Sequence, residues 1–127
     1  MSQQAWGIAP KVREVDELLR SDPGMQSRVR EVHPELCFMA WSGRPMAFAK
    51  KSTAGRLERR RLVDEHFGAT AYDSVRAQFA RKHVADDDIL DALAALWTAE
   101  RVLQGKACVI PASPPLDAFG LAMEMVF

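Results

Sequence analysis

Four aspartates stand at positions 86, 87, 88 and 91, where an apolar stretch predicts a helix from residue 86 to about residue 104. Asp86 and Asp87 are explained by capping and by the helix dipole, which both favour aspartate at a helix start. Asp91 lies past the first turn and shares a face with Asp87 and Asp88, where like charges cost about 0.2–0.5 kcal/mol. A divalent cation held by Asp88 and Asp91 would offset this repulsion, and carboxylate oxygens suit Mg²⁺ or Mn²⁺.

Two carboxylates on one helix are also common without a metal, so a third ligand from another element is needed. Glu31 is the candidate, because it lies near the end of a predicted strand over residues 28–33, where α/β folds gather polar site residues. We therefore predict Glu31, Asp88 and Asp91 as metal ligands and catalytic residues. Secondary candidates are His33, which could position water or bind phosphate but also suits a helix cap, Glu35, which also suits the helix dipole, and Asp87.

Basic side chains gather before and within a second predicted helix, which begins at Ser52 or Thr53 and ends near Gly68. Phosphate backbones favour such clusters through counterion release. The alternative is a solvated helix face, since the chain has 17 basic and 17 acidic residues and no net charge. The predicted nucleic-acid contacts are Lys50, Lys51, Arg56, Arg59 and Arg60.

The remaining pattern predicts further helices over residues 8–20, 34–41 and 72–83 and further strands over residues 106–111 and 121–127. Five helices interleaved with about three short strands indicate an α/β fold. On the aspartate helix, the small residues Ala92, Ala95 and Ala99 would let the acids lie close to the sheet.

The chain has 127 residues, which suits one domain, and 48% of them are hydrophobic, which indicates a globular protein. Its two cysteines lack zinc-ligand spacing, and a nucleophile elbow is not found in the sequence. Because the sequence also lacks the pattern of a signal peptide or a membrane span, we expect a reduced, cytoplasmic protein.

Several segments, taken in order, resemble a family of bacterial and archaeal proteins, an uncharacterised domain family predicted to be ribonuclease H-like nucleases. They are "QAWGIAPKVREVDELL", "REVHPELCF", "AFAKKSTAGRLERRRLV", "DDDILDALAALWTAERV" and "GLAMEMVF". The resemblance implies a ribonuclease H-like core in which acids from strands and a late helix bind divalent metals for phosphodiester hydrolysis. Asp88 and Asp91 match the two acids of the late helix at i,i+3, and Glu31 matches the acid at the end of the fourth strand.

Members of this family begin with a strand whose aspartate bridges the metals, and "MSQQAWG" does not resemble it. The resemblance thus implies the C-terminal portion of such a domain, over residues 1–127, with an incomplete core. We expect a metal-dependent nuclease that alone is weakly active or inactive and that contacts nucleic acid. The alternative is a non-catalytic module that forms homo-oligomers or binds a partner through an exposed sheet edge.

Overall fold

The computed structural model describes residues 3–127, which form two compact units. One unit contains the chain up to Glu31 together with Ile110–Met125, and the other contains Val32–Val109 with Val126–Phe127. The first includes α1 (Gln3–Ser21) and α2 (Pro23–Gln26). The second includes α3 (Pro34–Ser42), α4 (Thr53–Phe67), α5 (Ala71–Arg76) and α6 (Asp86–Leu103), and the two strands are β1 (Val109–Ile110) and β2 (Met125–Val126).

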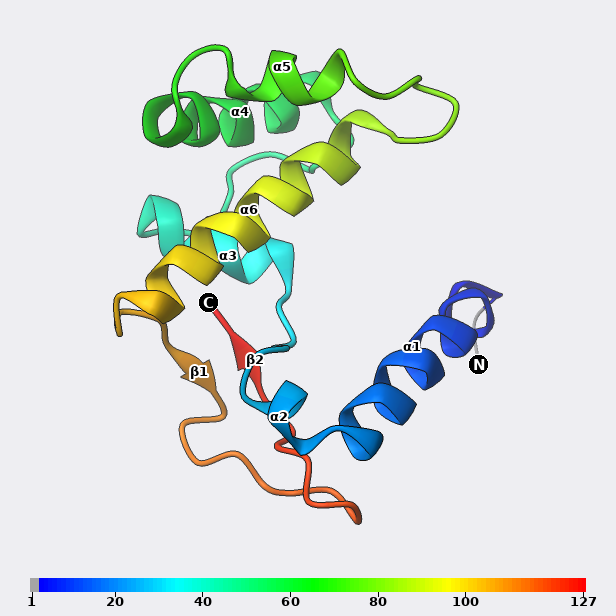
Figure 1. Cartoon of the computed structure of the whole chain (residues 1–127). Coiled ribbons are helices and arrows are strands. Elements are labelled where there is room, and N and C mark those ends of the chain that lie inside the picture. Colours follow the sequence, from blue (N-terminus) through cyan, green and yellow to red (C-terminus); the bar gives the residue numbers. More distant parts are fainter. Residues whose placement is uncertain (1–2) are drawn as a thin grey trace. The chain divides into compact units, whose positions relative to one another are not determined.

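In the second unit, α6 packs against α3 on one side and against α4 and α5 on the other (Figure 1). The spacing of its apolar residues explains this position, because one wide face of the helix is buried. The indole rings of Trp41 in α3 and Trp97 in α6 stack with their centroids 4.9 Å apart. The core cluster of this unit consists of Cys37, Phe38, Val63, Tyr72, Ile89, Leu90, Leu93 and Ala94.

The ribonuclease H-like α/β fold with about three strands that we predicted is wrong. The chain is mostly helical, with 56% of residues in helices and 6% in strands or isolated bridges, and its sheet has two strands of two residues each. The predicted strand over residues 28–33 is reduced to a single parallel bridge between Val32 and Val126. Prolines explain why the pairing at Val32 and the strand β1 are short. Pro34 follows Val32 and Pro111 follows β1, and a proline cannot donate a ladder hydrogen bond.

Two further predictions were wrong within the helical part. The helix expected over residues 72–83 ends at Arg76, whose guanidinium donates to the carbonyl oxygens of Phe79 and Val84 and so stabilises turns instead. The small residues Ala92, Ala95 and Ala99 were expected on the closely packed side of α6. Ala92 and Ala99 are in fact exposed, because the bulky residues of α6 occupy the buried side.

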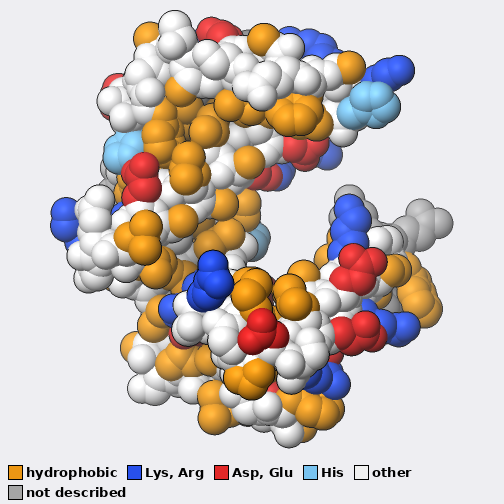
Figure 2. All heavy atoms as spheres, viewed as in Figure 1, with side chains coloured by type: hydrophobic (Ala, Val, Ile, Leu, Met, Phe, Trp, Pro, Cys, Tyr) orange, Lys and Arg blue, Asp and Glu red, His pale blue; other side chains and the backbone are white. Residues whose placement is uncertain are grey.

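The exposed side of α6 is partly apolar. Figure 2 shows hydrophobic side chains gathered over this helix, and Leu96 and Leu103 are among its exposed large hydrophobic residues.

Across residues 3–127, none of the helices has both the length and the apolar character that crossing a bilayer requires.

The first unit is held together by a few contacts between α1, the segment after α2 and the loop before β2. The guanidinium of Arg20 lies 3.5 Å from the ring centroid of Phe119, and Arg30 forms an ion pair with Glu124. These contacts join parts of the chain that are far apart in sequence.

Candidate functional site

The loop that leads into α4 is fixed by hydrogen bonds to its backbone. Ser52 is the N-cap of α4: its hydroxyl accepts from the Gly55 N–H at 2.9 Å and donates to the Ala49 oxygen at 2.7 Å. A Cβ atom on Gly55 would lie 2.1 Å from the Ala49 oxygen, so the loop can approach the helix this closely only because residue 55 is glycine. Glu58 accepts from the backbone N–H groups of Ala47 and Phe48, and the first of these bonds is the main cause of its lowered pKa.

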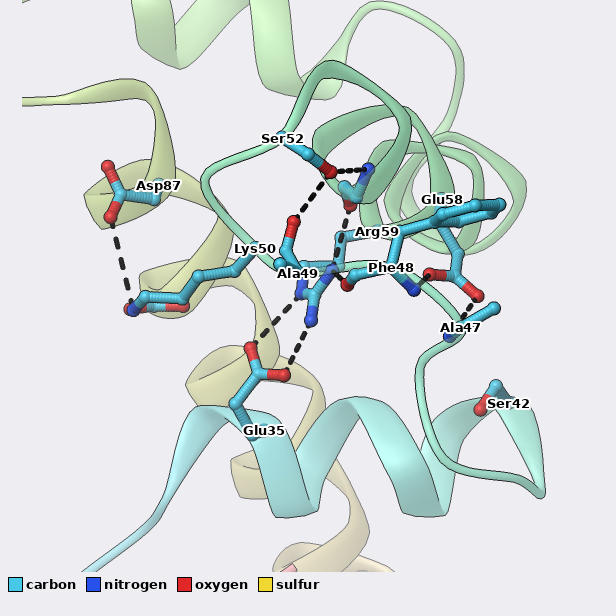
Figure 3. A network of polar contacts seen from close by, with 12 residues as sticks. Glu35, Ser42, Ala47, Phe48, Ala49, Lys50, Ser52, Glu58, Arg59 and Asp87 are labelled. Atoms are coloured by element: carbon cyan, nitrogen blue, oxygen red, sulfur yellow. Dashed lines mark hydrogen bonds and ion pairs between the residues drawn. The ribbon is translucent and has the colours of Figure 1, made fainter.

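Arg59 holds the same loop from inside the unit. Its side chain is 2% exposed and binds both carboxylate oxygens of Glu35 on α3, at 3.1 and 2.5 Å (Figure 3). It also donates to the carbonyl oxygens of Phe48 and Gly55, at 3.2 and 2.9 Å. Arg59 and Glu35, which were predicted as a nucleic-acid contact and a secondary site residue, are thus joined to each other in a structural ion pair.

The fixed loop places Lys50 beside two acids of α6. The Lys50 ammonium lies 3.0 Å from an oxygen of Asp91 and 3.9 Å from an oxygen of Asp87. The hydrogen bond to Asp91 is the main cause of the raised pKa of Lys50, and the charge of Asp87 adds to it. The repulsion between Asp87 and Asp91 at i,i+4 is therefore offset by an ammonium group of the chain itself.

The other two aspartates at the start of α6 have different partners. Asp88 accepts a hydrogen bond at 2.8 Å from the Ala85 N–H, as in a capping box. Asp86 forms ion pairs with Arg76 and Arg81, and its pKa is lowered mainly by the hydrogen bond from Arg81. Each acid of the run is thus explained by a contact within its own unit.

The predicted metal ligands have other partners in this structure. Asp91 is paired with the Lys50 ammonium, and Asp88 accepts its hydrogen bond from the Ala85 backbone. Within residues 3–127, the structure does not bring three or more His, Cys, Asp or Glu side chains together as a metal site. Glu31 is exposed and belongs to the other compact unit, and His33 is the exposed N-cap residue of α3, without a capping hydrogen bond from its side chain.

A pocket of about 320 Å³ opens between the start of α4 and the start of α6. It is lined by the basic residues Lys50, Lys51, Arg56 and Arg81, by Asp86 and Asp87, and by Ala85. We call it the basic pocket. Lys50 and Arg81 are neutralised there by aspartates. Lys51 and Arg56 have no acidic partner within 4 Å in the part of the chain that the structure describes, so the pocket presents two uncompensated positive charges.

Three of the predicted nucleic-acid contacts, Lys50, Lys51 and Arg56, therefore line one pocket. Arg60 lies outside it, where it binds Asp64 and Asp73 and covers the Tyr72 ring at 4.7 Å.

Sequence reasoning missed Arg81 as a pocket residue. The one signal that could have pointed to it is the run of acids five residues further on, since exposed arginines pair readily with carboxylates.

The second unit is thus a small helical module with a basic pocket at the N-terminal ends of two of its helices. The chain belongs to the family described as "Protein of unknown function (DUF429)", whose model matches residues 1–116. Comparison with curated proteins gives no match, and comparison with solved structures gives none either.

Proposed function

We propose that the chain binds the phosphate groups of a nucleic acid in the basic pocket, as the substrate-holding part of a phosphodiester nuclease. The observation that supports binding is the pair Lys51 and Arg56, which line the pocket without an acidic partner among the described residues. What supports hydrolysis is the sequence resemblance to predicted nucleases alone.

The electrostatic balance of the pocket favours an anion. Asp86 is bound by two arginines and Asp87 lies beside Lys50, so neither carboxylate presents a free negative charge to an incoming phosphate. Arg56 is oriented by its own hydrogen bonds to the Lys51 oxygen and the Thr53 hydroxyl, at 2.8 and 3.4 Å. A planar guanidinium held in this way keeps further N–H groups available for phosphate oxygens.

The experiment measures fluorescence anisotropy of a labelled single-stranded oligonucleotide between about 50 and about 200 mM salt. Two phosphate contacts predict that the logarithm of the binding constant falls with the logarithm of salt concentration with a slope of about −1.4. Replacing both Lys51 and Arg56 by glutamine should remove most of this slope. Unchanged affinity in that double variant, or no binding at low salt, would refute phosphate binding.

The matched control removes two charges elsewhere in the same unit. Arg61 and Lys82 are exposed and do not line the basic pocket, so a double glutamine variant at these positions should bind as the wild type does. If the control variant loses as much affinity as the pocket variant, the binding reflects overall charge and not the pocket.

The same samples test hydrolysis. Because Lys50 and the backbone engage the acids of α6, we expect the chain alone to leave the oligonucleotide intact in Mg²⁺ or Mn²⁺. Cleavage that depends on the metal and is lost in Asp88→Asn would contradict this expectation. The alternative, a module that oligomerises or binds a partner through a sheet edge, stays a prediction, and the two-residue strands offer it a short edge.

A further inference from the structure

A second pocket, of about 220 Å³, adjoins the basic pocket and shares Arg56, Arg81 and Asp86 with it. It lies between α4, α5 and α6, and charged side chains of all three helices surround its two leucines and its tyrosine, Leu57, Leu90 and Tyr72. We call it the apolar pocket. A ligand whose charged group is in the basic pocket can therefore extend over a less polar surface within the same unit.

The lining of the apolar pocket suits a flat, partly apolar group. Leu90 is 2% exposed and belongs to the core. Leu57 also lines the pocket but is 53% exposed, so its side chain can contact a ligand. The guanidinium of Arg60 lies over the Tyr72 ring, and both side chains line the pocket. Guanidinium planes and aromatic rings are the groups on which nucleobases stack in proteins that bind single strands.

The size of the apolar pocket limits what it can hold. At about 220 Å³ it is smaller than the pockets of about 300–1,000 Å³ that hold whole drug-sized ligands, so it suits one base better than a base pair. A base in a duplex would have to leave its stack and its partner to enter, which costs a few kcal/mol.

We infer that the apolar pocket holds one unpaired nucleobase of a strand whose phosphate lies in the basic pocket, so that the chain binds single-stranded nucleic acid in preference to a duplex. This inference rests on the proposed phosphate binding and adds the class of strand. Leu57 and the guanidinium of Arg60 contact the base, the buried Tyr72 ring supports that guanidinium from below, and Lys51 and Arg56 contact the phosphate.

The test compares three labelled probes of equal length: an oligothymidylate of about 12 nucleotides, the same backbone with abasic sites throughout, and a duplex. The oligothymidylate should bind about tenfold more tightly than the abasic strand, which has the same phosphates. It should also bind more tightly than the duplex at equal salt.

Leu57→Ser should weaken binding of the oligothymidylate about fivefold and leave binding of the abasic strand unchanged, because only the apolar contact is lost. Leu96→Ser is the matched control: Leu96 is similarly exposed, at 49%, lies on α6 and lines neither pocket. This control should bind both strands as the wild type does, and circular dichroism checks the fold of both variants.

The possible outcomes separate the two proposals. Equal, salt-dependent binding of the oligothymidylate and the abasic strand would overturn the base site and leave phosphate binding intact. Tighter binding of the duplex would also overturn the preference for single strands. If none of the three probes binds, both proposals fail together.

Discussion

Replacing Arg59 by methionine should destabilise the second unit strongly, because Arg59 joins α4 to α3 and to the loop before α4. The variant keeps most of the aliphatic volume and removes the charge. It leaves the Glu35 carboxylate without its two hydrogen bonds and the carbonyl oxygens of Phe48 and Gly55 without a donor from Arg59. The effect therefore comes from lost polar contacts in a buried setting.

The magnitude follows from the burial of the two partners. Removing one member of a buried ion pair costs about 3–5 kcal/mol. The Arg59 side chain is 2% exposed, whereas that of Glu35 is 37% exposed and can regain water once its partner is gone. We therefore expect the lower end, about 3 kcal/mol of unfolding free energy. For a domain of about 60–100 residues, this loss lowers Tm by more than about 12 °C.

The assay follows tryptophan fluorescence during urea and thermal unfolding in a Trp6→Phe background. Trp6 belongs to the first unit, so the signal then comes from Trp41 and Trp97, which stack in the core of the second. Arg59→Lys keeps the charge but cannot bind Glu35 in a bidentate way, so this variant should lose a large part of the unfolding free energy that Arg59 contributes.

The control for this experiment is Arg61→Met, which removes an exposed arginine of the same helix and should change the free energy of unfolding by less than about 0.5 kcal/mol. A loss below about 1 kcal/mol in Arg59→Met would refute the reasoning, because that is the range of an exposed ion pair.

Two further predictions concern titratable groups of the second unit. The pKa of Asp86 is lowered by Arg81, so the ion pair stabilises the fold above the carboxyl's ordinary pKa and is lost as the pH falls through the lower folded value. Asp86→Asn should thus be less stable than the wild type at pH 7, and urea unfolding should show this difference disappearing well below about pH 4. Cys108 is exposed, whereas Cys37 is fully buried and burial raises the pKa of its thiol. Ellman's reagent should therefore titrate one thiol in the native protein and two in guanidinium, and two fast thiols in the native protein would contradict the packing around Cys37.

Helices whose ends carry a local signal could be predicted from the sequence. Ser52 caps α4 through its own side chain and Gly68 follows its last residue, so both boundaries depend on residues within one turn. Pro34 starts α3 for the same kind of reason, because its fixed φ and missing N–H suit a first helical position. These elements need no partner elsewhere in the chain to be recognised.

The places of β1 and β2 could be predicted, since both strands lie within the ranges expected over residues 106–111 and 121–127, but their length could not, because pairing depends on distant residues. The apolar residues near Val32 and Val109 have the composition of buried strands, but how far a ladder extends depends on which segments meet. Cys108 and Phe127 exchange two backbone hydrogen bonds, and the ladder has ended by Pro111. An apolar run of this length fits a two-residue strand as well as a longer one.

The acids of α6 show where sequence reasoning about a site reaches its limit. Asp87 and Asp91 repel each other at i,i+4, and this need for a cation follows from the sequence alone. The cation is the ammonium of Lys50, which is 41 positions from Asp91 and is brought there by the loop that Arg59 holds. A lysine and a divalent ion offset the same repulsion, so the spacing of the acids is equally consistent with both. Only the fold distinguishes the two cations, because it shows whether a lysine of the chain lies beside the acids. The contacts of the chain's own lysines should therefore be considered before a metal is assigned to an acidic pair on a helix.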